Sequence, residues 1–440
     1  MSTTERQAER APVPLSYSKV EIWYVVALLA AANACSYLDR MALPVLMPLV
    51  KTDLHLADWQ LGLLVGPAFA LFYAVCGIPI ARWADRGVRR DIIAVALVVW
   101  SGMTMLSGAA GSFFQLLLAR IGVGAGEAGC LPPAQSLLCD YAPVERRAGI
   151  LGVHSSGISV GTLAGMALAG WLGEIVGWRW TMVIFGVPGI VLAITVRLTL
   201  REPKRGALEG NAPLEPVSLA ETLRFLRRSR SYCLIILYLI LYGFSLYGLN
   251  QWLPSFYMRV HGLALGAAGV AVGVIAGIGG FAGLLLGGWL SDRLGRRDLA
   301  RPFVWGAAAV AIAFPLTLAA ILVNSTNLSL ALIFVSSVLM GTPGAAYTAA
   351  LYSVAPPTMR ATAGALGIFF TSALGLGLGP FAVGIASDVF SAAWGPVGLR
   401  YALLFPIALV PIMPFVLLAA SRSLSNDLSA RAPAPPSAFS

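Results

Sequence analysis

Charged residues are scarce in this 440-residue sequence: only 11% are Asp, Glu, Lys or Arg, whereas soluble domains carry about 25%. Hydrophobic residues make up 58% of the chain, and so few charges cannot cover that much apolar surface in water. The scarcity therefore excludes an ordinary soluble protein. We expect an all-α protein that crosses a membrane many times.

Residues that serve catalysis and metal binding are also few. The chain has 3 His and 5 Cys, and the cysteines show neither a CxxC pair nor another metal-binding spacing. It contains no HExxH motif, no GxSxG motif with partners and no Walker loop. These absences argue against a membrane hydrolase and against direct use of ATP. We therefore expect no enzyme activity, no cofactor and no bound metal.

A secretory signal is missing as well. Residues 1–19 are polar and mixed in charge, and they lack a short apolar core with a cleavage site. The net charge of +10 could indicate a nucleic-acid partner, but the Arg and Lys residues lie in short loops between apolar runs. Charge in that arrangement sets membrane topology. We expect no nucleic-acid partner.

Long apolar runs dominate what is present. Twelve segments of about 20 residues are each long enough to cross the hydrocarbon core of a bilayer, and they form two groups of six. The expected spans are 20–49, 58–82, 91–110, 112–138, 147–172, 178–199, 231–257, 265–290, 302–323, 328–353, 361–387 and 398–420. The predicted organisation is a tail at 1–19, a six-helix bundle at 20–199, a linker at 200–230, a second bundle at 231–420 and a tail at 421–440.

Basic residues indicate the orientation of these spans. Arg-rich loops precede the third, fifth, ninth and eleventh spans and fill the central linker. The loops on the other side offer little beyond Lys51, Arg179, Arg259 and Arg400. Because positive charge is retained on the cytosolic side, we expect both termini in the cytosol and the chain in the cell (inner) membrane.

Two motifs occur twice, about half a chain apart. Asp85-Arg86-Gly87-Val88-Arg89-Arg90 follows the second span, and Asp292-Arg293-Leu294-Gly295-Arg296-Arg297 follows the eighth. An Ala-Pro-x-x-x-Arg-Ala segment likewise ends at Ala148 before the fifth span and at Ala361 before the eleventh. The repeats indicate a duplicated six-helix unit, and hence two pseudo-symmetric bundles.

Four charged residues lie inside the spans of the first half: Asp39 and Arg40 in the first span, and Arg120 and Glu127 in the fourth. Such residues are costly at bilayer depth, so they are expected to pair and to face an internal cavity. Adjacent side chains on a helix diverge by about 100°, so Asp39 and Arg40 need different partners. Arg120 and Glu127 lie two turns apart, about 10 Å, which is too far for an ion pair. We expect each to meet Asp39 or Arg40.

The chain resembles the major facilitator superfamily of secondary transporters over residues 20–420. The doubled Asp-Arg-x-Gly-Arg-Arg-type loop is the most recognisable signature of that family, although Val88 separates the Gly from the basic pair in the first copy. The segments Tyr37-Leu38-Asp39-Arg40 and Arg120 to Ala128 are similar to those of the spinster branch. Organic-anion symporters of the superfamily carry related patterns.

This resemblance implies alternating access by rocking of two six-helix halves. It also implies proton-linked transport of amphiphilic anionic or zwitterionic lipids, such as lysophospholipids or sphingosine-1-phosphate. Organic-anion symport and multidrug export are the alternatives within the superfamily, and a receptor or sensor is the alternative outside transport. The expected partners are membrane lipids, a small amphiphilic substrate and protons, and the expected state is a monomer.

We interpret the four charges as a proton–substrate switch. Asp39 and Glu127 are predicted to carry protons, while Arg40 and Arg120 contact an anionic substrate that competes with the carboxylates. The alternative is that the ion pairs only hold helices in register. Further candidate substrate contacts are Tyr37, Tyr247, Asn250 and Tyr347.

The repeated loops give a second hypothesis. The family resemblance implies that they latch the cytosolic side shut, whereas a simpler interpretation is that their arginines only set topology. We prefer the latch because topology requires neither an Asp nor a Gly. The predicted gate residues are Asp85, Arg86, Arg89, Arg90, Asp292, Arg293, Arg296 and Arg297.

Three smaller features complete the predictions. Glycines recur every four residues at 157, 161 and 165 and again at 269, 273 and 277, and we place both stripes on the seam between the halves, with packing inside one half as the alternative. The spacing from Ser218 to Glu221 predicts the start of a short amphipathic helix against the cytosolic surface. His154 is a possible proton relay, although a packing histidine is more common.

Overall fold

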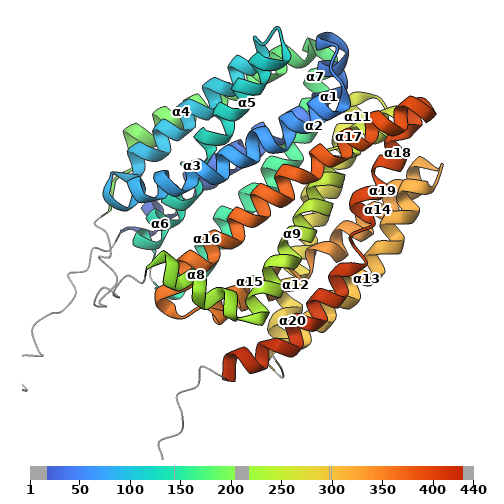
Figure 1. The fold of residues 1–440 in the computed structure, drawn as a ribbon. Coiled ribbons are helices and arrows are strands. Elements are labelled where there is room, and N and C mark those ends of the chain that lie inside the picture. Colours follow the sequence, from blue (N-terminus) through green and yellow to red (C-terminus); the bar gives the residue numbers. More distant parts are fainter. Residues whose placement is uncertain (1–16, 143, 204–217, 297, 299, 430–440) are drawn as a thin grey trace, which may run out of the picture.

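The computed structural model describes residues 17–142, 144–203, 218–296, 298 and 300–429, and the regular elements of these residues are all helices (Figure 1). The first half contains α1 (Lys19–Leu54), α2 (Asp58–Val65), α3 (Pro67–Arg86), α4 (Arg89–Gly108), α5 (Phe113–Glu127), α6 (Leu131–Tyr141) and α7 (Arg147–Thr199). The linker contains α8 (Leu219–Arg228). The second half contains α9 (Arg230–Asn250), α10 (Leu253–Arg259), α11 (Leu265–Gly273), α12 (Gly280–Gly295), α13 (Arg301–Leu322), α14 (Thr326–Gly341), α15 (Gly344–Val354), α16 (Arg360–Phe370), α17 (Gly377–Trp394), α18 (Gly398–Ala402), α19 (Leu404–Ile407) and α20 (Ile412–Ser429).

Two π-helical turns interrupt the second half, η3 (Val274–Gly279) between α11 and α12 and η5 (Thr371–Leu376) between α16 and α17. Within the described chain, nine helical stretches are long and apolar enough to cross a membrane. Two of them, Gly149–Thr199 and Thr362–Leu424, are long enough for two crossings each. These stretches provide eleven crossings, and α5 with α6 cover the predicted fourth span at 112–138. The structure is therefore consistent with the twelve predicted spans.

A kink separates the two crossings of α7. Gly177 adopts a positive φ of 76° inside this helix, a conformation that glycine reaches without the steric cost of a side chain. The kink lies between the predicted fifth and sixth spans. Sequence and backbone therefore agree on where the chain turns back.

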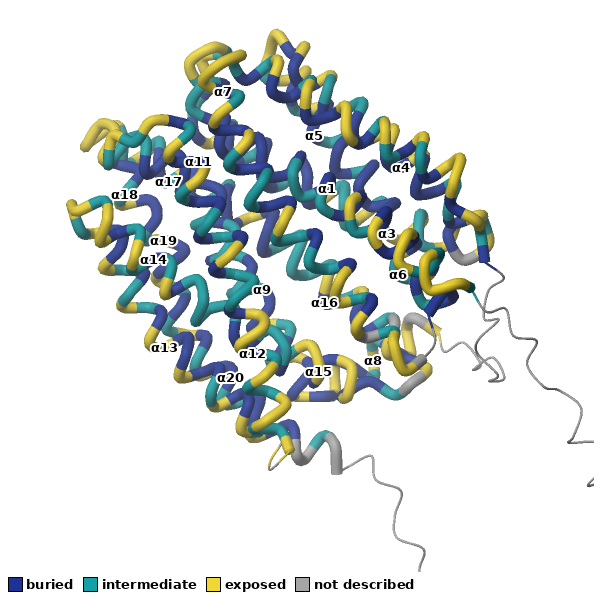
Figure 2. The backbone as a smooth tube through the Cα atoms, turned by 180° about the vertical axis from the view of Figure 1, so that it is seen from behind, coloured by how far each residue is buried: buried dark blue, intermediate teal, exposed yellow. Residues whose placement is uncertain are grey.

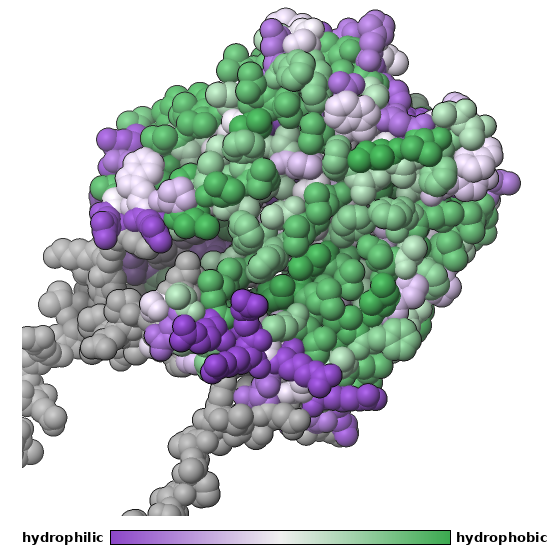
Figure 3. All heavy atoms as spheres, viewed as in Figure 1, coloured by the Kyte–Doolittle hydropathy of each residue, from purple (hydrophilic) through white to green (hydrophobic). Residues whose placement is uncertain are grey.

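The two ends of the molecule differ in what they hold. The described chain begins and ends at the same end, which also carries α6 and α8, and we call it the terminal end (Figure 1). The opposite end, which carries α2, α11 and α18, is here called the far end. Hydrophilic residues gather near the ends, while hydrophobic residues cover the surface between them (Figure 3). That surface suits a chain surrounded by lipid.

The two halves share a hydrophobic core at the far end. Leu43 and Leu46 of α1 belong to the same buried cluster as Trp252, Phe256 and Leu399 of the second half. A second cluster around Trp100 lies mostly in the first half but includes Leu376 of the second, and a third around Tyr238 belongs to the second half and the linker helix. Figure 2 shows the resulting pattern, with buried residues on the inward faces of the helices and exposed residues outside. Packing thus holds the halves together mainly at the far end.

The two glycine stripes have different neighbours. A Cβ on Gly161 would lie 2.2 Å from the carbonyl oxygen of Ala34, so this stripe packs α7 against α1 inside the first half. A Cβ on Gly269 would lie 2.4 Å from the carbonyl oxygen of Met166, so the second stripe packs α11 against α7 across the halves. The seam prediction is confirmed for the second stripe and wrong for the first, because α7 uses opposite faces for α1 and α11.

The linker helix α8 begins where the capping spacing predicts. The Ser218 hydroxyl accepts a hydrogen bond of 3.2 Å from the Glu221 N–H, and Thr222 and Leu226 are buried. Its apolar face packs against α9 and α16, while Arg224, Arg227 and Arg228 are exposed. The apolar face of α8 therefore covers the second half of the protein.

Candidate functional site

A buried ion pair joins the first span to the fourth. Arg40 donates a hydrogen bond of 2.6 Å to Oε2 of Glu127, and the Ser36 hydroxyl donates a second one of 2.7 Å to the same oxygen. Ser36 and Arg40 lie one turn apart on α1 and so share a face. The exposed fractions of Arg40 and Glu127 are 7% and 2%. The pairing of α1 with Glu127 is as the sequence predicts.

Arg120 is the opposite case. The sequence predicts that it pairs with α1, but the described residues give this buried guanidinium no ion-pair partner, so that part of the prediction is wrong. Its side chain is 2% exposed, and its Nε has no hydrogen-bond partner. Glu127, Arg40 and Asp39 are the charged groups that act on it electrostatically, and the ring of Phe69 lies 5.5 Å away. A buried cation in this situation is costly unless an anion compensates it. This makes Arg120 a candidate contact for an anion.

Asp39 is fully buried on a different face of α1. Its Oδ2 accepts a long hydrogen bond of 3.4 Å from the hydroxyl of Thr104 on α4. Its Oδ1 has no hydrogen-bond partner within the described structure. Asp39 and Arg40 thus have separate partners, as expected from adjacent positions on a helix.

Aromatic rings surround the guanidinium of Arg40. Its Cζ lies 4.7 Å from the ring centre of Tyr37, 4.5 Å from that of Phe69 and 5.3 Å from that of Tyr73. Such contacts favour a cation that has been withdrawn from water. Tyr37 was predicted from the sequence, whereas Phe69, Tyr73, Ser36 and Thr104 were not. The spacing of four between Phe69 and Tyr73 was the available signal, because it places both rings on one helix face.

The second half contributes tyrosines that approach this cluster. Tyr247 on α9 interacts electrostatically with Tyr37 and Arg40 across the halves, and Tyr347 with Tyr247. The ring of Tyr347 lies 6.5 Å from that of Tyr242. The structure therefore brings Tyr37, Tyr247 and Tyr347 to one region, in which the second half offers phenol groups.

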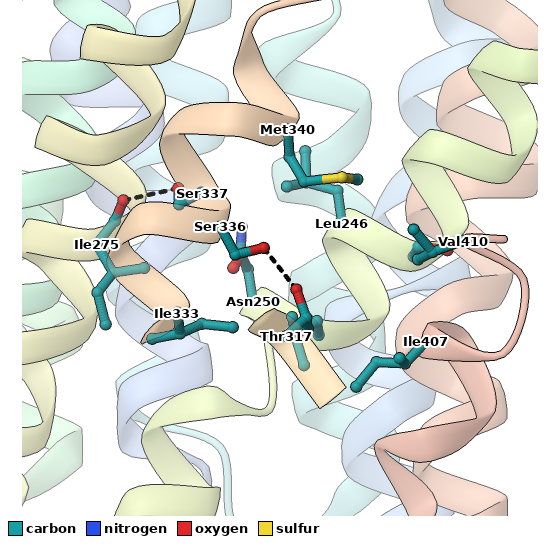
Figure 4. A pocket seen from close by; sticks show the side chains of 12 residues that line it. Leu246, Asn250, Ile275, Thr317, Ile333, Ser336, Ser337, Met340, Ile407 and Val410 are labelled. Atoms are coloured by element: carbon teal, nitrogen blue, oxygen red, sulfur yellow. Dashed lines mark hydrogen bonds between the residues drawn. The ribbon is translucent and has the colours of Figure 1, made fainter. Parts of the chain in front are cut away.

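Asn250 lies elsewhere, beside a cavity of about 40 Å³ inside the second half (Figure 4). Around it, Thr317 and Ser336 share a hydrogen bond and Ser337 donates one of 3.0 Å to the carbonyl oxygen of Ile275. Leu246, Met340, Ile407 and Val410 add an apolar lining. This volume holds only a few water molecules. In this conformation Asn250 therefore borders a small internal space.

The predicted gate residues of the first loop contact their own half. Arg89 is buried and donates to Asp140, to Glu202 and to the Pro203 carbonyl oxygen. Arg90 pairs with Asp91 at 2.8 Å. These bonds fix the start of the linker to α4 and α6. Arg86 is exposed, and the side chain of Asp85 lies outside the described residues.

The second loop is more exposed. Asp292, Arg293 and Arg296 are all exposed, and the Arg293 guanidinium lies 5.5 Å from the ring centre of Trp289. Arg297 lies outside the described residues. The exposed side chains of Asp292, Arg293 and Arg296 therefore do not form the predicted latch in this conformation.

His154 remains apart from the ion-pair cluster. Its ring is 1% exposed and neither ring nitrogen has a hydrogen-bond partner in the described part of the chain. Its backbone carbonyl accepts a hydrogen bond of 3.0 Å from Asn33 of α1. These contacts place His154 in the packing between α1 and α7.

Among the described residues, the site therefore combines a buried ion pair, a guanidinium without an ion-pair partner and a second acid within one six-helix half. A family model described as Major Facilitator Superfamily matches residues 29–380. An MFS-type efflux pump of Mycolicibacterium smegmatis is 33% identical over 89% of this chain and 90% of its own length. Protein spinster of Drosophila melanogaster is 30% identical over 86% of this chain and 64% of its own length. The chain belongs to the Major Facilitator Superfamily, in its spinster branch.

Solved structures agree with this membership. A bacterial homologue of the human lysosomal transporter Spinster, in an inward-facing and unoccupied conformation, matches 93% of this chain and 99% of its own, with 31% identity and a TM-score of 0.84. More distant relatives of this superfamily member include a hexuronate transporter of Bacillus subtilis, 26% identical over 84% of this chain and 90% of its own length. Transport is therefore the activity shared by the family.

Proposed function

We propose that this protein is a proton-coupled carrier of amphiphilic anionic or zwitterionic lipids that works by alternating access. The observation that carries the proposal is the contrast between Arg120 and Arg40. Among the described residues, the Arg120 guanidinium is buried without an ion-pair partner, whereas that of Arg40 is paired with Glu127 within the same half. Such a site can accept one negative charge from a substrate and release one carboxylate for protonation.

The coupling follows from charge balance. A substrate anion that binds Arg120 and Arg40 displaces Glu127 from its ion pair. The displaced carboxylate, still surrounded by protein, is stabilised by taking up a proton. When the proton leaves, Glu127 binds Arg40 again and the substrate loses its contact. Asp39 serves as a second proton carrier in this scheme.

Aromatic and apolar surroundings support a lipid-like substrate. Tyr37, Phe69 and Tyr73 from one half and Tyr247 and Tyr347 from the other offer rings with polar tips near the guanidiniums. Such rings suit the boundary between a charged headgroup and an apolar tail. The cavity beside Asn250 would have to widen to take part of a tail. The terminal end is cytosolic in this proposal, the membrane is the cell (inner) membrane, and the carrier is a monomer.

Transport of a small carboxylate is the second candidate. The hexuronate relative and a cis,cis-muconate transport protein of Acinetobacter baylyi, 26% identical over 82% of this chain, favour it. Export of amphiphiles is the corresponding alternative from the Mycolicibacterium smegmatis efflux pump. A small anion would need charged contacts from both halves, whereas the phenols of the second half carry no charge.

The test is flux in proteoliposomes with an imposed pH gradient, measured for a lysophospholipid and for a muconate-sized dicarboxylate. We expect lysophospholipid flux that follows the gradient, and we expect Glu127→Gln to lose that dependence. Glu145→Gln, which changes an exposed acid at the terminal end, is the matched control and should behave like the wild type. Gradient-driven flux of the dicarboxylate alone would support the second candidate, and gradient-driven flux in Glu127→Gln would refute the role of this residue.

A further inference from the structure

Each half of the molecule provides a carboxylate that binds a helix N-terminus of the other half, at the far end. Asp388 of α17, in the second half, accepts hydrogen bonds of 2.9 and 2.8 Å from the N–H groups of Asp58 and Trp59 at the start of α2. Glu174 of α7, in the first half, accepts one of 2.8 Å from the N–H of Gly266 in the first turn of α11. The two contacts cross the seam in opposite directions.

Neither recipient helix has a capping oxygen on its N-cap residue, although the Gln60 side chain of α2 accepts a hydrogen bond of 2.9 Å from the Ala57 N–H. Ala57 and Ala264 occupy the N-cap positions of α2 and α11, and alanine offers no oxygen to the free N–H groups of the first turn. A carboxylate at a helix N-terminus is also favoured by the helix dipole. Asp388 and Glu174 thus supply across the seam what other helices obtain from a neighbouring Ser, Thr, Asn or Asp.

The internal repeat relates the two contacts to each other. When the first half is shifted by the number of residues between Asp85 and Asp292, Asp58 aligns with Leu265. Both recipient helix N-termini therefore begin the second span of their half. When the first half is shifted by the number of residues between Arg147 and Arg360, Glu174 falls within one residue of Asp388. Both accepting carboxylates therefore lie at the end of the fifth span of their half. The duplication has therefore produced a reciprocal pair.

Asp58 adds an ion-pair network beside the first of these contacts. Its buried carboxylate accepts hydrogen bonds of 2.6 and 2.9 Å from Arg259, one of 2.6 Å from Lys51 and one of 2.6 Å from Ser387. Arg259 and Ser387 belong to the second half, whereas Lys51 belongs to the first. The close approach of α2 to α17 is possible because Gly384 lies against the carbonyl oxygen of Asp58.

We propose that Asp388 and Glu174 are paired gating residues that hold the far end of the carrier closed. When the halves rock apart at this end, both helix N-termini lose these cross-seam acceptors and must be hydrated instead. The network at Asp58 breaks in the same movement. The free energy of these contacts therefore helps to set the ratio of far-end-closed to far-end-open molecules. The proposal depends on alternating access alone and not on the substrate or on proton coupling.

The test measures distances between spin labels in nanodiscs by electron double resonance. One label pair at the positions of Thr52 and Ala393 reports on the far end, and another at Glu145 and Thr358 reports on the terminal end; all four are exposed. Attachment through non-natural amino acids leaves the native cysteines unlabelled. Each pair places one label in each half.

Asp388→Asn and Glu174→Gln are nearly isosteric and remove the charge. Each is expected to raise the far-end-open fraction about fivefold, the usual effect of losing one helix cap, with longer far-end distances and shorter terminal-end distances. The double variant should exceed both, and Asp388→Glu should restore much of the wild-type distribution.

Asp53→Asn is the matched control. Asp53 pairs with Arg179 at 2.7 Å and accepts a hydrogen bond from Trp178, all at the far end but within the first half. It should leave both distance distributions unchanged. Unchanged distributions in a folded Asp388→Asn and Glu174→Gln double variant would overturn the proposal, and so would an equal shift in Asp53→Asn, because the effect would then be a general response to lost charge.

Discussion

The guanidinium of Arg40 lies 2.6 Å from the carboxylate of Glu127, and this contact joins α1 to α5 at a depth where neither charge is stable alone. Removal of one partner leaves the other buried and uncompensated. We therefore predict that Arg40→Met lowers the free energy of unfolding by about 3 kcal/mol. Thermal unfolding in detergent measures this as a lower apparent Tm.

The double variant Arg40→Met with Glu127→Gln is the informative comparison for that pair. Because it removes both charges, it should be more stable than the sum of the single variants predicts, by about 1–3 kcal/mol. Additive losses would show that the two side chains do not interact in the membrane-embedded protein.

Arg120 gives a contrasting prediction. It has no ion-pair partner in the described structure, so Arg120→Met should leave the free energy of unfolding unchanged or raise it by up to about 2 kcal/mol. Thermal unfolding measures this as an unchanged or higher apparent Tm. The same variant should lose the stabilisation that an anionic lysolipid gives to the wild type. A large drop in Tm without lipid would mean that Arg120 is a structural residue.

The charged cluster could be predicted from the sequence because depth and helix periodicity constrain it strongly. Two charges seven residues apart cannot pair with each other, and adjacent charges on α1 cannot share a partner, which leaves pairing between α1 and α5 as the economical solution. Which pair forms was not predictable. The choice of Arg40 for Glu127 depends on the rotation of both helices and on the rings of Tyr37, Phe69 and Tyr73, which occupy the space around Arg40.

The far-end contacts could not be predicted from the sequence. Asp388 and Glu174 look like ordinary acids at the ends of apolar runs, and their acceptor role depends on which helix starts lie opposite. The glycine stripes have the same limit. A spacing of four predicts one smooth face on α7, but only the packing decides that Gly161 meets α1 while Gly269 meets α7 from the other half.

Gly62 offers a packing test of the seam between the halves. A Cβ at this position would lie 2.6 Å from the carbonyl oxygen of Pro380 and 3.0 Å from Cα of Phe381, both backbone atoms of the other half. Gly62→Ala should therefore destabilise the far-end-closed form by about 1–3 kcal/mol. Gly77→Ala in α3 is the control, because its Cβ would meet nothing within 4 Å. Through the higher helix propensity of alanine it should raise the free energy of unfolding by up to about 1 kcal/mol, which thermal unfolding measures as a higher apparent Tm. Equal effects of the two changes would contradict the close approach of α2 to α17.

His261, in the loop between α10 and α11, gives a pH dependence at the far end. Burial, and then the nearby charge of Arg400, lower the pKa of His261 below its ordinary value of 6.5. Because the folded protein binds this proton less readily than the unfolded chain, the stability that His261 contributes is present above pH 6.5 and is lost as the pH falls through the folded pKa. The wild type should thus lose apparent Tm between pH 7.5 and about pH 5. His261→Phe keeps the ring contacts with Phe256 and Tyr257 and should lose less, whereas the exposed His55→Asn should follow the wild type. If His261→Phe shows the full wild-type pH dependence, the acid sensitivity arises at another group.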